Sequence, residues 1–231
     1  MSLVSTADLI ALFWFLAAWI GYSAVIEMTP RGKSGLNGLM HRYRSLWMER
    51  MLARDTRMMD GQVIASLQNG TAFFASSSLI ALGGAVTLFH VTEDMLTIVA
   101  ALPFGEPVSH VQWEVKVVGL MIIFVYAFFK FAWAYRLYNY VAIMVGAAPP
   151  ASEQDTPEEK AHAESAALII TDAGRHFNRG QRAFFFALGY LGWFLGPLPL
   201  IATTAAIVVV MWRRQFASIS SVAVRATRSG A

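Results

Sequence analysis

Four long stretches of the chain carry almost no charge, and this pattern limits the possible folds more than any other feature. They lie near residues 9–27, 63–89, 117–137 and 183–212. A helix needs about 20 mainly apolar residues to cross a bilayer, with about 17 as a practical minimum. Charged residues are only 14% of the chain, whereas an ordinary soluble domain has roughly a quarter. The sequence therefore predicts an all-α, polytopic membrane helix bundle, a single domain with about four transmembrane helices.

The fourth stretch, residues 183–212, leaves two arrangements open. As one helix it would extend about 45 Å, which exceeds a hydrocarbon core of about 30 Å. Its middle contains the sequence Gly196-Pro197-Leu198-Pro199, and proline removes an intrahelical hydrogen bond. The stretch is either one kinked, tilted span or a re-entrant pair of short helices that enter and return on the same side.

Basic residues are distributed unevenly among the connections. The connection after the first stretch is rich in arginine, whereas the connection between the second and third has no lysine or arginine before Lys116. Positive residues favour the cytoplasmic side of a membrane. We therefore expect a multi-pass protein of the cell inner (plasma) membrane with its N-terminus outside. Four crossings, the preferred arrangement, place the C-terminal arginines on the wrong side, and a re-entrant fourth stretch would remove that conflict; they are Arg213, Arg214, Arg225 and Arg228.

Two connections are predicted to be helical outside the membrane. Residues 36–60 form a cytoplasmic amphipathic helix, because apolar residues recur at spacings of three and four beside a basic face. This helix either joins two spans at the inner headgroups, the preferred interpretation, or senses the surface or docks a partner. Residues 146–182 form a cytoplasmic loop and helix, in which Thr156 and Glu159 have capping-box spacing. The predicted apolar stripe of the first helix comprises Leu36, Met40, Tyr43, Trp47 and Met51.

Charged residues at membrane depth are costly, and they are candidates for function by default. Lys130 lies inside the third stretch, where it either contacts an anion in the bundle or extends its side chain to the headgroups. Arg136 and Asn139 continue a polar and aromatic belt at the same level. Gln68 and Asn69 begin a serine-rich face of the second stretch, which suits either helix packing or a polar permeation path.

Further candidates lie near the predicted cytoplasmic boundary. Asp60 is expected to pair with one of the nearby bases, such as Arg54 or Arg57. A second set shares one helical face and forms either an anion-binding patch or, preferably, a salt-bridge network. These residues are Asp172, Arg175, His176 and Arg179.

The chain shows no recognisable catalytic or metal-binding pattern. It contains no cysteine, and its five histidines have no paired spacing such as HxxxH or HExxH. No phosphate-binding glycine loop or catalytic serine, histidine and aspartate set is found. We therefore expect no cofactor, metal site or catalytic residue, and enzymatic activity is disfavoured though not ruled out.

Three blocks of sequence together resemble the membrane proteins of domain-of-unknown-function family 599. They begin RSLWMERMLARDTRMMDGQ, FVYAFFKFAWAYRLYNYV and HFNRGQRAFFFALGYLGWFLGPLP, and they extend from about Arg44 to Phe216. The resemblance implies a compact, multi-pass bacterial inner-membrane protein, and it implies no activity. The matching positions are Trp47, Met48, Met51, Arg54, Arg57, Asp60, Lys130, Trp133, Arg136, Asn139, Phe177, Gly180, Arg182, Gly196 and Pro197.

Two functions remain in view from the sequence. The preferred one is a non-catalytic structural or accessory subunit that self-associates or docks on a larger membrane complex. The alternative is a small oligomeric channel or transporter with a basic cytoplasmic mouth. Either would have the lipid bilayer and anionic headgroups at the cytoplasmic face as partners, and neither involves nucleic acid.

Overall fold

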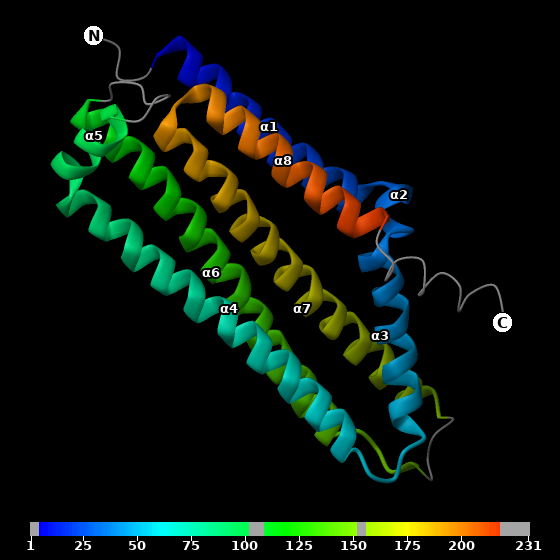
Figure 1. Ribbon diagram of the computed structural model, residues 1–231. Coiled ribbons are helices and arrows are strands. Elements are labelled where there is room, and N and C mark those ends of the chain that lie inside the picture. Colours follow the sequence, from blue (N-terminus) through cyan, green and yellow to red (C-terminus); the bar gives the residue numbers. More distant parts are fainter. Residues whose placement is uncertain (1–4, 102–108, 152–155, 218–231) are drawn as a thin grey trace.

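The structure is a computed structural model of the chain that describes residues 5–101, 109–151 and 156–217. All regular secondary structure within these residues is helical, which confirms the predicted fold class. The helices form an elongated bundle in which α7 lies between α6 on one side and α1 with α8 on the other (Figure 1). In chain order they are α1 (Thr6–Met28), α2 (Pro30–Lys33), α3 (Leu36–Leu52), α4 (Met58–His90), α5 (Thr92–Ala101), α6 (His110–Gly146), α7 (Pro157–Tyr190), the 3-10 turn η2 (Leu191–Leu195) and α8 (Pro197–Phe216).

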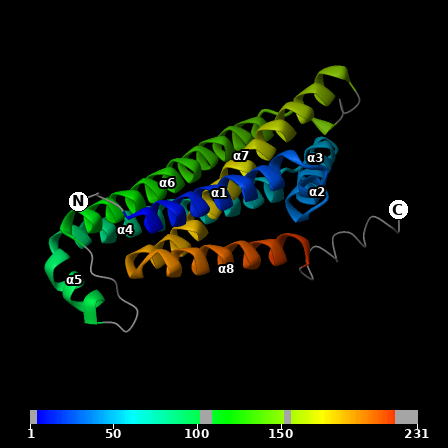
Figure 2. The ribbon, with the colours of Figure 1, turned by 90° about the horizontal axis from the view of Figure 1, so that it is seen from above.

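Four helices are long and apolar enough to cross a membrane: α1, α4, α6 and α8. The lengths of the main helices fall into two groups. Helices α1 and α8, of 23 and 20 residues, match a bilayer, but α4, α6 and α7 have 33, 37 and 34 residues and reach about 50 Å or more. The excess length of the three long helices extends past the ends of α1 and α8 (Figure 2).

The predicted fourth stretch is divided between two helices. Its first residues are the end of α7, which stops at Tyr190, and its remainder is α8, which returns alongside α1. The turn between them is Gly196, whose φ of 135° is accessible to glycine and strained for other residues. Pro197 then begins α8, where its missing N–H costs nothing. The break therefore lies at one end of the bundle and produces a hairpin of two long helices.

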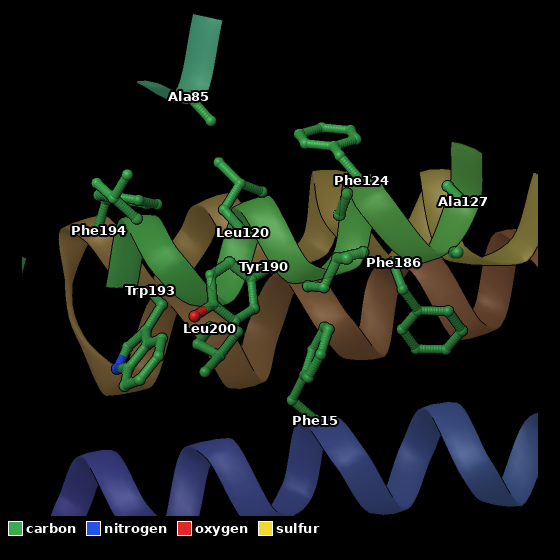
Figure 3. Close-up of a cluster of buried hydrophobic side chains, with 14 of the residues drawn as sticks. Phe15, Ala85, Leu120, Phe124, Ala127, Phe186, Tyr190, Trp193, Phe194 and Leu200 are labelled. Atoms are coloured by element: carbon green, nitrogen blue, oxygen red, sulfur yellow. The ribbon is translucent and has the colours of Figure 1, made fainter. Parts of the chain in front are cut away.

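One hydrophobic core occupies the membrane-length part of the bundle, and it is mainly aromatic. Phe15 of α1 reaches towards Phe186 and Tyr190 of α7 (Figure 3), and its ring meets theirs edge to face with centroids 5.8 and 5.4 Å away. Trp193 of η2 and Leu200 of α8 close the same cluster (Figure 3). Rings in this geometry add attraction beyond their area.

A second core lies where α4, α6 and α7 extend beyond α1 and α8, and here α3 joins them. It combines alanines, most of them on α7, with methionine from α3, aliphatic residues from α4 and α6, and Tyr138 of α6. Small side chains allow these helices to approach closely. The buried members include Ala163, Ala166, Ala173, Met48, Met51, Ile64 and Val141.

Helix α3 differs from the predicted amphipathic helix in length and in buried face. It ends at Leu52 rather than at residue 60, and it packs along α7. Its buried residues are Leu39, Met48, Met51 and Leu52, so Met51 alone of the predicted stripe is buried, and Tyr43 is exposed. The buried face of α3 therefore differs from the predicted apolar stripe, because α3 packs on α7.

The start of α7 agrees with the sequence. Thr156 accepts a hydrogen bond from the backbone N–H of Glu159, and Pro157 occupies the first turn. The reciprocal half of a capping box is absent, because the Glu159 carboxylate is buried with no hydrogen-bond partner among the described residues.

Candidate functional site

An ion cluster lies where α1 and α8 end against the middle of α7. The Glu27 carboxylate accepts hydrogen bonds from Arg179 Nε at 3.0 and 3.1 Å, and also from Arg179 Nη2 and Arg182 Nη2. Arg182 is buried, whereas Glu27 and Arg179 are partly exposed. Two guanidinium groups therefore share one carboxylate, and the cluster retains positive charge.

A pocket of about 190 Å³ adjoins this cluster, between α1, α3, α7 and α8; we call it the junction pocket. Two buried donors on its wall have no hydrogen-bond partner among the described residues: Arg182 Nε and Gln215 Nε2. No aspartate or glutamate lines it. The lining residues are Tyr22, Ile26, Leu36, Asn37, Asn178, Gln181, Arg182, Phe185, Met211, Arg214 and Gln215.

The expected pairing of Asp60 is present, with Arg54 as the base. Asp60 is fully buried at the start of α4, and its Oδ1 also accepts a hydrogen bond from Trp47 Nε1 at 2.6 Å. Arg57 does not join this pair. It donates instead to the backbone carbonyls of Ala148, at 2.6 Å, and Pro149, which ties the α3–α4 connection to the end of α6.

The polar residues predicted on the second and third stretches separate into buried and exposed positions. Gln68 Nε2 donates to Asn139 Oδ1 at 2.6 Å, joining α4 to α6, whereas the neighbouring Asn69 is exposed on the outer side of α4. Lys130 lies over the ring of Tyr126 with its Nζ 5.1 Å from the ring centroid. Arg136 is exposed and donates to Tyr140 Oη at 2.6 Å.

The predicted face of α7 divides into separate environments. His176 Nε2 lies 3.8 Å from Asp172 Oδ2. Arg175 is exposed, and Arg179 belongs to the ion cluster with Glu27. On the facing helix, His41 Nδ1 lies 2.7 Å from Thr171 Oγ1. Burial, with a smaller contribution from the positive charges of Arg175 and Arg44, lowers the pKa of His41 below its ordinary value.

At the opposite end of the bundle, polar groups surround Trp193. The Asp8 carboxylate accepts a hydrogen bond from Trp193 Nε1 at 2.6 Å, and Lys116 Nζ donates to the Trp193 carbonyl at 2.8 Å. All three side chains are buried. These contacts hold the α7–α8 turn against the first turns of α1 and α6.

The sequence interpretation did not assign site roles to Glu27, Arg182, Asp8, Trp193 or Gln215. Two of them carried a usable signal: Glu27 closes the first apolar stretch, and Arg182 follows Arg179 by three residues at the start of an uncharged run. Opposite charges at the boundaries of two apolar segments indicate a pair at one membrane face. The α7–α8 hairpin places the other three: its turn brings Trp193 to Asp8, and the return of α8 brings Gln215 to the junction pocket.

The fold and its apolar helices define a polytopic helical membrane protein, and within the described residues no group of three metal-ligating side chains is present. The family described as "Protein of unknown function, DUF599" matches residues 10–220, and the chain belongs to that family. No curated protein and no solved structure matches the chain. The family resemblance expected from the sequence is thus confirmed.

Proposed function

We propose that this protein is a non-catalytic structural membrane subunit that self-associates through the outer face of α4. Helix α4 lies at the edge of the bundle, on the side of α6 away from α1 and α8 (Figure 1). One stripe of its exposed residues recurs at heptad-like spacings of four and three, and most members of this stripe are small or polar. They are Gln62, Ser66, Asn69, Phe73, Ser76, Ile80, Gly83 and Thr87.

The carrying observation is the contrast between two sets of helical glycines. On the α7–η2 segment, a Cβ added to Gly189 or Gly192 would contact Thr203, Thr204 or Pro199 of the α8 segment, so those glycines serve packing within the chain. A Cβ added to Gly70, Gly83 or Gly84 of α4 would meet nothing within 4 Å among the described residues.

Small and hydroxyl-bearing residues on a membrane helix favour close helix–helix contact, because lipid offers no hydrophobic force to drive association. Within the membrane-length part of α4, Ser76 and Gly83 face outwards where another helix could approach. A second copy of the chain in the same membrane would present the identical stripe, and a two-fold axis would make the two stripes complementary. A second copy is therefore the occupant that we propose.

The hairpin also supports a topology of five crossings, with α7 as the additional one. Helix α8 returns beside α1, so Arg213 and Arg214 lie at the same end as the basic α2–α3 segment, and Arg31 lies over the ring of Trp212 at 5.2 Å. The proposed orientation puts this end in the cytoplasm and the N-terminus outside, in the inner (plasma) membrane. Arg225 and Arg228 of the earlier conflict lie outside the described residues.

The absence of native cysteine makes the test direct. Ser76→Cys and Gly83→Cys should each form a disulfide-linked dimer when membranes are oxidised. Phe129→Cys, on the exposed face of α6, is the matched control and should remain monomeric. Gly83→Leu should abolish the dimer without unfolding the monomer, because the site is open.

Monomer alone from both α4 variants, together with a monomeric mass in native mass spectrometry, would refute self-association. Purification with a larger complex would point instead to an accessory role. The channel alternative loses its main support, because the break at Gly196 lies at the end of the bundle and Gln68 is bonded to Asn139. Ion flux in liposomes that Lys130→Ala alters would favour it again.

A further inference from the structure

The junction pocket combines hydrogen-bond donors with an apolar wall. Asn37 of α3, Asn178 and Gln181 of α7 and Gln215 of α8 contribute amides, whereas Ile26 and Met211 are among the apolar residues. At about 190 Å³ the pocket is smaller than the roughly 300–1,000 Å³ of typical ligand sites. Its size suits a headgroup-sized ligand rather than an extended one.

Two residues that line this pocket each have a buried donor without a partner among the described residues. Arg182 is 6% exposed; its Nη2 is bonded to Glu27, but its Nε has no acceptor among the described residues. Gln215 is 7% exposed, and its Nε2 is equally without an acceptor. An unsatisfied buried donor is destabilising, and in native proteins such groups are usually satisfied by a partner or a ligand.

Positive charge exceeds negative charge around the pocket, which also favours an anionic ligand. Arg179 and Arg182 share the single carboxylate of Glu27, and Arg214 stands at the pocket wall over the ring of Phe185 at 5.5 Å. Three guanidinium groups therefore lie in or beside the pocket, whereas Glu27 is the one carboxylate that bonds two of them. A ligand that satisfies both the free donors and the charge must be an anion with oxygen acceptors.

We infer that the junction pocket binds a phosphate group, either that of an anionic phospholipid headgroup or free phosphate. Guanidinium groups match the geometry of phosphate oxygens, and amide donors complete the set. The pocket lies where α1 and α8 end, which is headgroup level for a bilayer matched to those helices. Its apolar wall would accommodate the start of a lipid acyl chain.

The test uses the purified full-length protein in detergent, with short-chain phosphatidylglycerol and inorganic phosphate as separate probes. Isothermal titration should detect binding of at least one probe, and short-chain phosphatidylcholine, which has no net charge, should bind far more weakly. Arg214→Ala should weaken binding about tenfold, as expected for one charge-assisted hydrogen bond. Arg213→Ala is the matched control, because this neighbouring arginine is exposed and does not line the pocket.

Arg182→Gln should abolish binding, but it also removes a partner of Glu27 and could disturb the fold. Gln215→Leu is therefore the second pocket variant, and it should weaken binding while leaving the helical circular dichroism unchanged. Phosphatidylglycerol binding without phosphate binding identifies a lipid ligand, and comparable affinities identify free phosphate. Failure of both probes to bind, or equal affinities in wild type, Arg214→Ala and Gln215→Leu, would overturn the inference.

This inference does not depend on self-association. Gly83→Leu, which lies on α4 and outside the pocket, should leave phosphatidylglycerol binding unchanged. A dimer that forms without binding either probe would refute only the pocket, and binding by a strict monomer would refute only the α4 interface.

Discussion

The half of the bundle that α1 and α8 cover, between the levels of Asp8 and Glu27, packs aromatic rings and is called the aromatic half. The other half, which contains α3, packs alanine and methionine. In the first half, the ring of Phe15 meets those of Phe186 and Tyr190 edge to face. In the second half, the buried face of α7 is a row of alanines against α3 and α6. The same long helices thus change their packing along their length.

The difference fits the proposed placement of the first half within the membrane and of the second half outside it. In lipid, burial of apolar surface provides little driving force, so helices are held by specific van der Waals contact and by hydrogen bonds. Outside lipid, the exclusion of water stabilises even small apolar side chains. The aromatic half also contains an apolar groove of about 440 Å³ between α1 and α6, whereas the second core is built around small alanine side chains.

The largest expected effect comes from truncating the aromatic core. Phe186→Ala removes a fully buried ring that stacks on Trp19 at 5.5 Å and meets Phe15. We expect a loss of about 3 kcal/mol, at the low end for phenylalanine in soluble cores because lipid also surrounds the unfolded state. Thermal unfolding in detergent measures it. Leu188→Ala, exposed on the same helix, should change the midpoint little, and equal effects would contradict the assigned core.

The alanine core should instead be sensitive to the enlargement of a side chain. Ala166→Leu places extra methyl groups at a position with no exposed surface, and we expect destabilisation of about 1–3 kcal/mol. Limited proteolysis should then cleave α3 and the first half of α7 before the aromatic half. The adjacent Ser165→Leu faces outwards and is the control. A proteolytic pattern identical to wild type would mean that this core is not closely packed.

A smaller effect is expected at the ion pair between Arg54, in the α3–α4 connection, and Asp60 of α4. Arg54→Ala leaves the buried Asp60 carboxylate with Trp47 as its remaining donor. Arg54 is itself 41% exposed and screened by water, so we expect only about 1 kcal/mol. Chemical denaturation at moderate salt measures it, with the exposed Arg50→Ala as control. A cost as large as that of Phe186→Ala would show that the ion pair is more deeply shielded.

The smallest effect is a pH dependence confined to α3. The pKa of His41 is lowered in the folded state, mainly by burial, so the neutral ring is preferred there. Its contribution to stability is complete above the ordinary histidine pKa and is lost as pH falls through the lowered value. Hydrogen exchange of α3 should accelerate over that range relative to the aromatic half. His41→Gln should remove the acceleration, and a persistent response would assign it to another group.

Much of this architecture was predictable, because charge-free length is a local property of sequence. The apolar stretches located α1, α4, α6 and α8, and the Thr156 cap located the start of α7. The pairing of Asp60 also followed, since its nearest bases were few. The buried face of α3 could not be predicted, because its phase depends on α7, more than a hundred residues away.

The candidate site was less accessible to prediction. Arg179 and Arg182 were visible as basic residues, but their partner Glu27 lies about 150 residues earlier in the chain. Gln215 carries no sequence signal at all. The junction pocket exists only because the α7–α8 hairpin brings its residues to the end of α1.

The sequence by itself determined an all-helical membrane protein with its basic residues concentrated towards one end, because hydropathy and charge act residue by residue. Tertiary structure decided the rest. It divided the fourth stretch at Gly196, placed the end of α8 beside α2, and extended three helices beyond the length of α1 and α8. Those outcomes depend on which helix faces pack together, and packing is a relation between distant segments that no single segment encodes.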